Sequence, residues 1–144
     1  MAIAAYLADT SAWLLSRRRD APRELRDSFG QLLSAGRVAI CGPVQWELLH
    51  STNNAEEYRE LRGRLSALDQ IPFGEADWKR ALDVGQQLAD RGGALHRAPS
   101  LTDAIVAVAA ERAGLTVLHY DKDFDLIAEV TGQPCEWIAP KGTV

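Results

Sequence analysis

Short, mostly apolar runs recur along the chain and predict strands that are covered on both faces. They span residues 3–8, 37–43 and 115–120, and each is followed closely by a helix-starting pattern. A fourth run over 135–140 is typical of an edge strand, which Pro140 limits because proline cannot donate to the ladder. Strands that alternate with helices predict an α/β fold, a three-layer α/β/α sandwich with a mostly parallel central sheet.

Apolar residues at helical spacing fill the segments between these runs. The predicted helices begin near Thr10, Pro22, Pro43, Glu56, Ser100 and Asp121, with a further one through Trp78. Gly36 and Gly114 are well placed to stop two of them, and residues 91–100 form a loop. The helix from Glu56 carries the stripe Tyr58–Leu61–Leu65–Leu68, which we expect to pack in the core, as we expect of most of the four tryptophans.

Composition and charge narrow the class of protein. The 144 residues, 47% of them hydrophobic, predict one domain over 1–144 with a sizeable core. The net charge of −4 argues against a surface coated in basic charge, but it leaves room for a local basic rim. We expect a cytoplasmic protein with no membrane association, because no apolar run approaches the roughly 20 residues of a membrane span and the start lacks a signal peptide's basic segment. Cys41 and Cys135 are predicted to be reduced.

Acidic residues follow the predicted strands. Asp9 ends the first strand, Asp121 and Asp123 follow the strand at 115–120, and Glu47 and Asp103 lie in the first turns of two helices. In open α/β sheets, ligands bind in the crevice beyond the carboxyl ends of the strands. The sequence therefore predicts that four or five carboxylates point into one crevice.

Each acid alone also has a structural interpretation. Asp9 with Thr10 and Ser11 is typical of a helix N-cap, Asp103 stands three residues after Ser100 as in a capping box, and Glu47 suits a solvated face. The group favours a metal site instead, because crowded carboxylates repel one another unless a cation offsets their charge. Oxygen ligands without paired His or Cys suit Mg²⁺ or Mn²⁺, which activate water for attack on a phosphodiester.

Four motifs in order, "LADTSAW", "PVQWELL", "SLTDAIVAVAA" and "LHYDKDFDLIA", resemble a PIN-domain protein, and most closely the VapC-type toxins of toxin–antitoxin pairs. The resemblance runs from about residue 5 to 138 and implies a Mg²⁺- or Mn²⁺-dependent endoribonuclease. It implies that the family's acidic quartet falls on Asp9, Glu47, Asp103 and Asp121, with Asp123 as a helper. Asp9 and Asp103 would be the main ligands, and Glu47 would bind a second metal or accept a proton from the attacking water.

The resemblance also implies supporting residues. The family's small hydroxyl after the first acid maps to Thr10 or Ser11, which would orient Asp9 or bind a water. Many relatives carry Thr or Ser where this chain has His119, so His119 is either a structural residue at the strand end or a proton donor. Candidates for a basic rim that contacts RNA are Arg17, Arg18, Arg19, His96, Arg97 and Lys122.

The resemblance implies partners too: an RNA substrate, a second copy of the chain, and a small VapB-like antitoxin. The Tyr58–Leu68 stripe would then serve as a hydrophobic groove for the antitoxin or as a dimer contact. An alternative is a noncatalytic PIN-like module that binds RNA or protein and whose acids only cap helices. A phosphotransferase of the haloacid-dehalogenase type ranks low, because it needs a second acid where this chain has Ser11.

Overall fold

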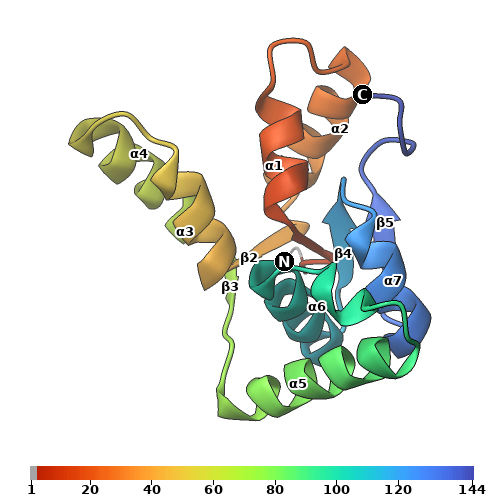
Figure 1. Cartoon of the computed structure of the whole chain (residues 1–144). Coiled ribbons are helices and arrows are strands. Elements are labelled where there is room, and N and C mark those ends of the chain that lie inside the picture. Colours follow the sequence, from red (N-terminus) through yellow and green to blue (C-terminus); the bar gives the residue numbers. More distant parts are fainter. Residues whose placement is uncertain (1–2) are drawn as a thin grey trace.

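The computed structural model describes residues 3–144, in which five parallel strands form one sheet (Figure 1). The strands are β1 (Tyr6–Ala8), β2 (Val38–Cys41), β3 (Asp69–Ile71), β4 (Thr116–His119) and β5 (Cys135–Trp137), in the spatial order β3-β2-β1-β4-β5. In the central strand, Leu7 pairs with Ala39 of β2 on one side and with Val117 of β4 on the other. All four strand pairings are parallel, so the predicted mostly parallel sheet is confirmed.

Helices connect the strands and cover both faces of the sheet. They are α1 (Thr10–Arg17), α2 (Arg23–Ser34), α3 (Gly42–His50), α4 (Ala55–Ser66), α5 (Glu75–Asp90), α6 (Leu101–Ala113) and α7 (Asp123–Thr131), with a short 3₁₀ turn, η1, at Leu95–Arg97. Crossovers in both directions from β1 put α1 and α2 on one face and α5–α7 on the other. Figure 1 shows α1 and α2 on one side of the sheet, α5, α6 and α7 on the other, and α3 and α4 extending sideways. The predicted three layers are therefore present.

The core surrounds the central strands, and α6 contributes most to it among the helices. β2 is buried throughout its four residues, and α6 is buried along most of its length, including Val106, Ala109 and Ala110. A helix that is apolar almost all round is one that is enclosed by its neighbours. A capping box of Ser100 and Asp103 starts α6, and Gly114 ends it with a φ of 70°.

The structure differs from the sequence predictions in two respects. β3 was not predicted, because it is a three-residue edge strand whose Asp69 and Gln70 are exposed and carry no apolar signal. The expectation that most tryptophans pack in the core was wrong: Trp13 is buried, but Trp46 and Trp78 are 69% and 46% exposed. None of the helices within residues 3–144 is both long and apolar enough to cross a bilayer.

Gly114 supplies a stability prediction. Replacing Gly114 with Ala forces a side chain into the left-handed region and should lower the free energy of unfolding by about 1 kcal/mol. The control Gly63→Ala lies inside α4 with open space at its Cβ and should raise that free energy by about 0.5–1 kcal/mol. Urea unfolding of both variants in EDTA measures these free energies. If the two substitutions change the free energy of unfolding in the same direction, the left-handed backbone of Gly114 does not explain the effect.

Candidate metal centre

The acids gather where the strand order reverses. Asp9 follows β1 directly, and Asp121 comes two residues after its neighbour β4. Connections leave β1 toward β2 and β3 on one side, whereas β4 and β5 lie on the other, so a crevice opens beyond these strand ends. The Asp9 backbone N–H donates to the Leu118 carbonyl at 2.9 Å, which places the first acid against the end of β4.

Ser11 links the two strand ends through its hydroxyl. Its Oγ donates to Asp9 Oδ2 at 2.7 Å and accepts from the Tyr120 backbone N–H at 2.9 Å. The Ser11 backbone N–H also donates to Asp9 Oδ2, at 3.1 Å, so Asp9 is the N-cap of α1. Asp9 thus caps a helix and also belongs to the acidic group, and the two interpretations of this residue do not exclude each other.

Thr10 reaches the other flank of the site. Its Oγ1 donates to Glu47 Oε1 at 2.8 Å, so α1 holds the exposed carboxylate that α3 contributes. Thr10 and Ser11 therefore bind different acids. Glu47 lies at the edge of the acidic group, where it is hydrogen-bonded to Thr10, the residue after Asp9.

Asp103 enters the site from the first turn of α6. Its Oδ2 accepts from the Ser100 backbone N–H at 3.0 Å, and its own N–H donates to Ser100 Oγ at 3.1 Å. This reciprocal capping box fixes the side chain and satisfies two N–H groups at the start of the helix. As with Asp9, the capping role and the position in the acidic group coexist.

Three carboxylates meet closely enough to share an ion. Asp103, Asp121 and Asp123 each offer one oxygen, and these oxygens all lie within 4.8 Å of one another. Asp121 Oδ1 also accepts from the Asp123 backbone N–H at 2.9 Å, which ties the two acids of this turn together. Asp9 lies close enough that its charge acts on Asp103.

Burial makes this group electrostatically unfavourable when it is ionised. Asp9 and Asp103 are only 3% and 6% exposed. Burial raises the pKa of Asp103 to about 6, and the charges of Asp9 and Asp121 add to this against the Ser100 hydrogen bonds. Burial is also the main cause of the raised pKa values of Asp9 and Asp123, and the charge of Asp121 contributes to both. A cation among these groups would relieve both the desolvation and the repulsion.

The donor set fits a hard divalent cation. Every ligand in this cluster is a carboxylate oxygen, and part of the group remains open to water. Mg²⁺ keeps several waters and takes one or a few carboxylates in such sites, and Mn²⁺ prefers the same ligands. The cluster can therefore hold a metal ion, although the arrangement does not select one ion over the other.

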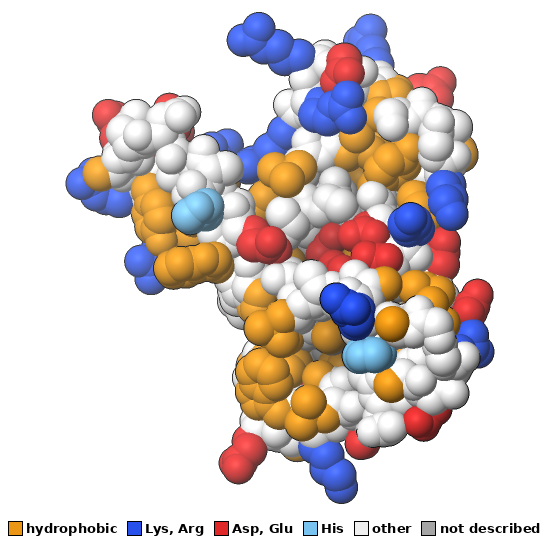
Figure 2. All heavy atoms as spheres, viewed as in Figure 1, with side chains coloured by type: hydrophobic (Ala, Val, Ile, Leu, Met, Phe, Trp, Pro, Cys, Tyr) orange, Lys and Arg blue, Asp and Glu red, His pale blue; other side chains and the backbone are white. Residues whose placement is uncertain are grey.

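Basic side chains flank the acids. Figure 2 shows a red acidic group at the centre of one face, with Lys, Arg and His side chains on either side of it. Arg97 lies in η1 just before α6, and Lys122 lies between Asp121 and Asp123; both are exposed, as is His96. Lys122 lies beside the acids in the chain, and Arg97 and His96 stand six and seven residues before Asp103; their contact with RNA stays a prediction.

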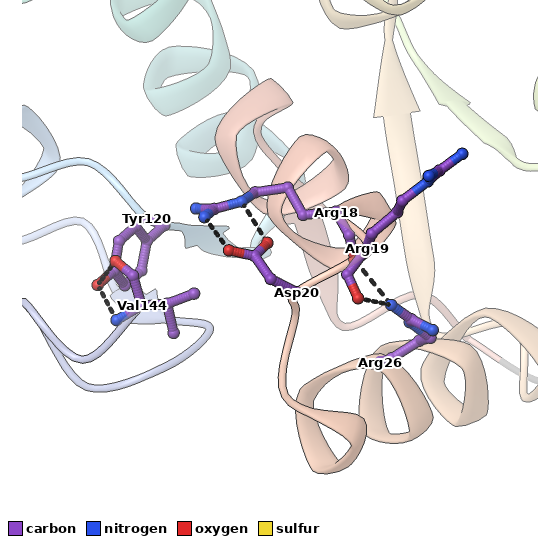
Figure 3. Close-up of polar contacts among 6 residues, drawn as sticks. All are labelled: Arg18, Arg19, Asp20, Arg26, Tyr120 and Val144. Atoms are coloured by element: carbon purple, nitrogen blue, oxygen red, sulfur yellow. Dashed lines mark hydrogen bonds and ion pairs between the residues drawn. The ribbon is translucent and has the colours of Figure 1, made fainter.

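Arg17 and Arg18, at the end of α1, are engaged elsewhere. Figure 3 shows Arg18 paired with Asp20 through two nitrogens, at 3.0 and 2.7 Å, while Arg19 points away from Tyr120. Arg26 donates to the Arg18 carbonyl at 2.7 Å. Arg17 lies over the Trp13 ring, so the structure does not bring it to the acids.

An apolar groove of about 400 Å³ opens between α1, α2 and α4. Its apolar lining comes from Trp13, Phe29, Leu33, Leu61, Leu65 and Leu68, and its charged lining from Arg17, Arg26 and Arg64. Leu61, Leu65 and Leu68 of the predicted stripe thus form one wall, whereas Tyr58 lines a different pocket. Sequence reasoning missed the wall from α1 and α2, although Phe29 and Leu33 stand at helical spacing.

Comparison with known proteins identifies the family. The PIN-domain family model matches residues 6–130. The chain belongs to the PIN-domain family. Within that family, this PIN domain is 40% identical to ribonuclease VapC18 and 42% identical to ribonuclease VapC51 of Mycobacterium tuberculosis, each over 139 residues. The alignments cover 96% of this chain and 98% and 96% of the relatives, so the PIN domain is of the VapC ribonuclease type.

Solved structures support the fold of this PIN domain. The VapBC complex of Salmonella typhimurium bound to DNA matches with a TM-score of 0.72 at 18% identity, over 95% of this chain and 100% of the other. FitAB bound to an IR36 DNA fragment matches with a TM-score of 0.68 at 15% identity, over 92% and 94% of the two chains. At these identities the likeness concerns the fold alone, and it agrees with the PIN-like sandwich predicted from the sequence.

The pKa of Asp103 gives a pH prediction for the metal-free PIN domain. Its folded pKa of about 6 exceeds the ordinary 3.8, so the folded state binds more protons than the unfolded state between these values. The free energy of unfolding should therefore fall as pH rises from about 4 to 6. The part of this decrease that Asp103 causes should be absent in Asp103→Asn. In EDTA at pH 8 we expect Asp103→Asn to be about 1–3 kcal/mol more stable than the wild type, with little difference near pH 4.

Chemical unfolding across pH 4–8 measures this difference, with Asp83→Asn, on the exposed face of α5, as the matched control. A wild type that matches or exceeds the Asn variant at pH 8 would contradict the strained cluster.

Proposed function

We propose that this VapC-type PIN domain is the endoribonuclease toxin of a toxin–antitoxin pair and that it hydrolyses RNA at the acidic centre. The relatives named as VapC ribonucleases support the activity. The observation that carries the site is the meeting of three carboxylate oxygens within 4.8 Å, contributed by segments nearly 20 residues apart, beside the buried Asp9. We propose Mg²⁺ or Mn²⁺ as the cofactor, bound chiefly by Asp9, Asp103, Asp121 and Asp123.

The chain's own residues prepare this site. A bound divalent ion supplies an activated water and charge neutralisation at the phosphate. Ser11 donates to Asp9 Oδ2, and the Ser100 backbone N–H donates to Asp103 Oδ2, so both carboxylates are held in place. Glu47, oriented by Thr10, would hold a second ion or accept the proton of the attacking water. These fixed carboxylates pre-organise the site, so that binding the ion requires little rearrangement.

Attraction of RNA to an acidic site requires positive charge around it. We propose that Arg97 and Lys122, which flank the acids and are exposed, contact the phosphates on either side of the cleaved bond. Arg18 joins them when it leaves Asp20, an exposed ion pair that costs little to open. Arg17 lines the apolar groove instead and is left out of the proposed rim.

The metal-dependent reaction is tested with acid substitutions. Asp121→Asn and Asp103→Asn each remove a ligand charge and should lower cleavage of RNA in Mg²⁺ by at least about 100-fold. Both should also lose most of the rise in melting temperature that Mn²⁺ gives the wild type. Asp83→Asn should leave both readouts unchanged. An equal response to Mn²⁺ in all four proteins would indicate a noncatalytic module whose acids only cap helices.

We also propose that the groove between α1, α2 and α4 receives the antitoxin. Its apolar floor suits an amphipathic segment, and its three arginines suit acidic residues flanking that segment. The groove lies next to α1, whose first residues hold Asp9 and Glu47. A segment bound there is therefore close enough to continue toward the acids and block them.

Gly30 allows this groove to be filled without disturbing the core. It lines the groove from α2, and a Cβ built on it meets nothing within 4 Å. Gly30→Leu should weaken antitoxin binding by about tenfold or more and leave RNA cleavage intact, because the added side chain occupies the site of the partner. Gly63→Leu on the exposed face of α4 is the matched control. Unchanged antitoxin affinity in Gly30→Leu, measured by calorimetry, would place the antitoxin elsewhere.

We propose that a second copy of the chain covers a different apolar surface, formed by Trp46 of α3, Trp78 and Leu82 of α5, and Leu101 of α6. All four side chains are exposed, and both α3 and α5 pack against α6. Figure 2 shows hydrophobic side chains gathered over this part of the molecule. Apolar residues that gather in this way, with tryptophan among them, are typical of protein interfaces.

The dimer is tested by placing charge on this surface. Light scattering should give the wild type twice the 15.8 kDa mass of the chain and the double variant Trp46→Glu/Leu82→Glu the mass of one chain. Leu14→Glu, at an exposed position of α1, should remain dimeric. A wild type that has the mass of one chain, or a double variant that stays dimeric, would refute the proposal that this surface is the dimer interface.

A further inference from the structure

His119 is a fully buried polar residue at the end of β4 that the proposed reaction does not use. Its side chain is 0% exposed, and its Nδ1 accepts a hydrogen bond from the backbone N–H of Asp121 at 3.1 Å. Because Nδ1 is the acceptor, the neutral ring carries its proton on Nε2. This Nε2 is buried and has no hydrogen-bond partner in residues 3–144.

The ring is held rigidly from two sides. Its centroid lies 4.9 Å from that of Phe124 and 5.0 Å from that of Trp137. The His119 carbonyl accepts from the Ile138 N–H at 2.8 Å, which anchors its backbone beside β5. Nδ1 therefore occupies a fixed position relative to the sheet.

From this fixed nitrogen, a relay of hydrogen bonds runs into the acidic turn. His119 Nδ1 accepts from the N–H of Asp121, and Asp121 Oδ1 in turn accepts from the N–H of Asp123. Each bond joins a side-chain acceptor to the N–H two residues on, the geometry that Asn and Asp use in Asx turns. Ser11 holds the intervening Tyr120 N–H. Two acids of the cluster thus take their orientation from a chain of contacts that starts at His119.

The unpaired Nε2 argues that this histidine does not serve stability alone. A buried N–H without a partner is costly, and an apolar ring of similar shape would pack between Phe124 and Trp137 without that cost. What an apolar ring cannot supply is the acceptor for Asp121. Residues that break a local stability rule in this way concentrate at functional sites.

We propose that His119 is a positioning residue of the metal centre, which fixes Asp121 directly and Asp123 through Asp121 so that both face Asp103. The inference rests on the proposed metal site and adds to it a residue that never touches the ion. Its role is to reduce the freedom of two ligands before the ion binds. Loss of such a supporting contact typically weakens metal binding by about 10–100-fold.

Two substitutions separate positioning from packing. His119→Phe keeps an aromatic ring against Phe124 and Trp137 but has no acceptor. His119→Asn loses the ring but restores an acceptor at the equivalent place on the side chain. We expect Mn²⁺ affinity, measured by calorimetry, to fall at least about tenfold in His119→Phe and to stay within about threefold of the wild type in His119→Asn. The melting temperature in EDTA should fall further in His119→Asn than in His119→Phe.

A purely structural role would make metal affinity follow the melting temperature. The positioning role is therefore overturned if His119→Phe binds Mn²⁺ like the wild type, or if His119→Asn is the weaker binder of the two. Amide hydrogen exchange at Asp121 gives a metal-free readout, which should be faster in His119→Phe and near the wild-type rate in His119→Asn. Asp103→Asn distinguishes the two proposals: if it binds Mn²⁺ as tightly as the wild type, the metal centre itself is refuted and the positioning role falls with it.

Discussion

The burial of several carboxylates in one place is the constraint on which the rest of this site depends. Asp9 and Asp103 are almost fully enclosed; burial is the main cause of their raised pKa values, and the charge of Asp121 adds to both. Such a group lowers the stability of the empty fold, and a raised pKa is the measure of that cost. A divalent cation bound here would relieve both the desolvation and the repulsion, so the feature that strains the fold would also equip it for the proposed phosphodiester chemistry.

The framework withstands this strain through hydrogen bonds that tie each acid to a rigid element. Ser11 binds Asp9 to the end of β4, Ser100 binds Asp103 to the start of α6, and His119 binds the backbone of Asp121 to the core. Parallel strand order does the rest, because β1 and β4 are neighbours although more than 100 residues separate them in the chain. Hydrogen bonds to nearby residues thus fix the position of each acid, and the sheet brings their segments together.

Much of this arrangement is readable from the sequence, and the remainder depends on contacts that no local pattern encodes. Apolar runs predicted β1, β2, β4 and β5, and acids at strand ends predicted the place where the carboxylates gather. β3 carries no such signal, because it is a short edge strand with exposed polar residues. Trp46 and Trp78 were misplaced because residue type alone does not reveal which face of a helix lacks a covering element.

The Ser11–Tyr120 and His119–Asp121 contacts escaped prediction for different reasons. The first joins residues 109 positions apart, so only the paired strands create it. The second is local, yet a histidine two residues before an acid has no distinctive pattern, and its meaning appears only when the ring is seen to be buried. The cytoplasmic location and the single domain over 1–144 stay predictions.

The most direct measurement of the central claim is anomalous diffraction from crystals of the protein grown with Mn²⁺. The account predicts a manganese peak among Asp103, Asp121 and Asp123, within about 2.0–2.3 Å of a carboxylate oxygen from at least two of them. Asp103→Asn crystals grown in the same way should show a weaker peak or none. A cluster without manganese at millimolar Mn²⁺, or an ion bound only at the exposed acids elsewhere on the surface, would contradict it.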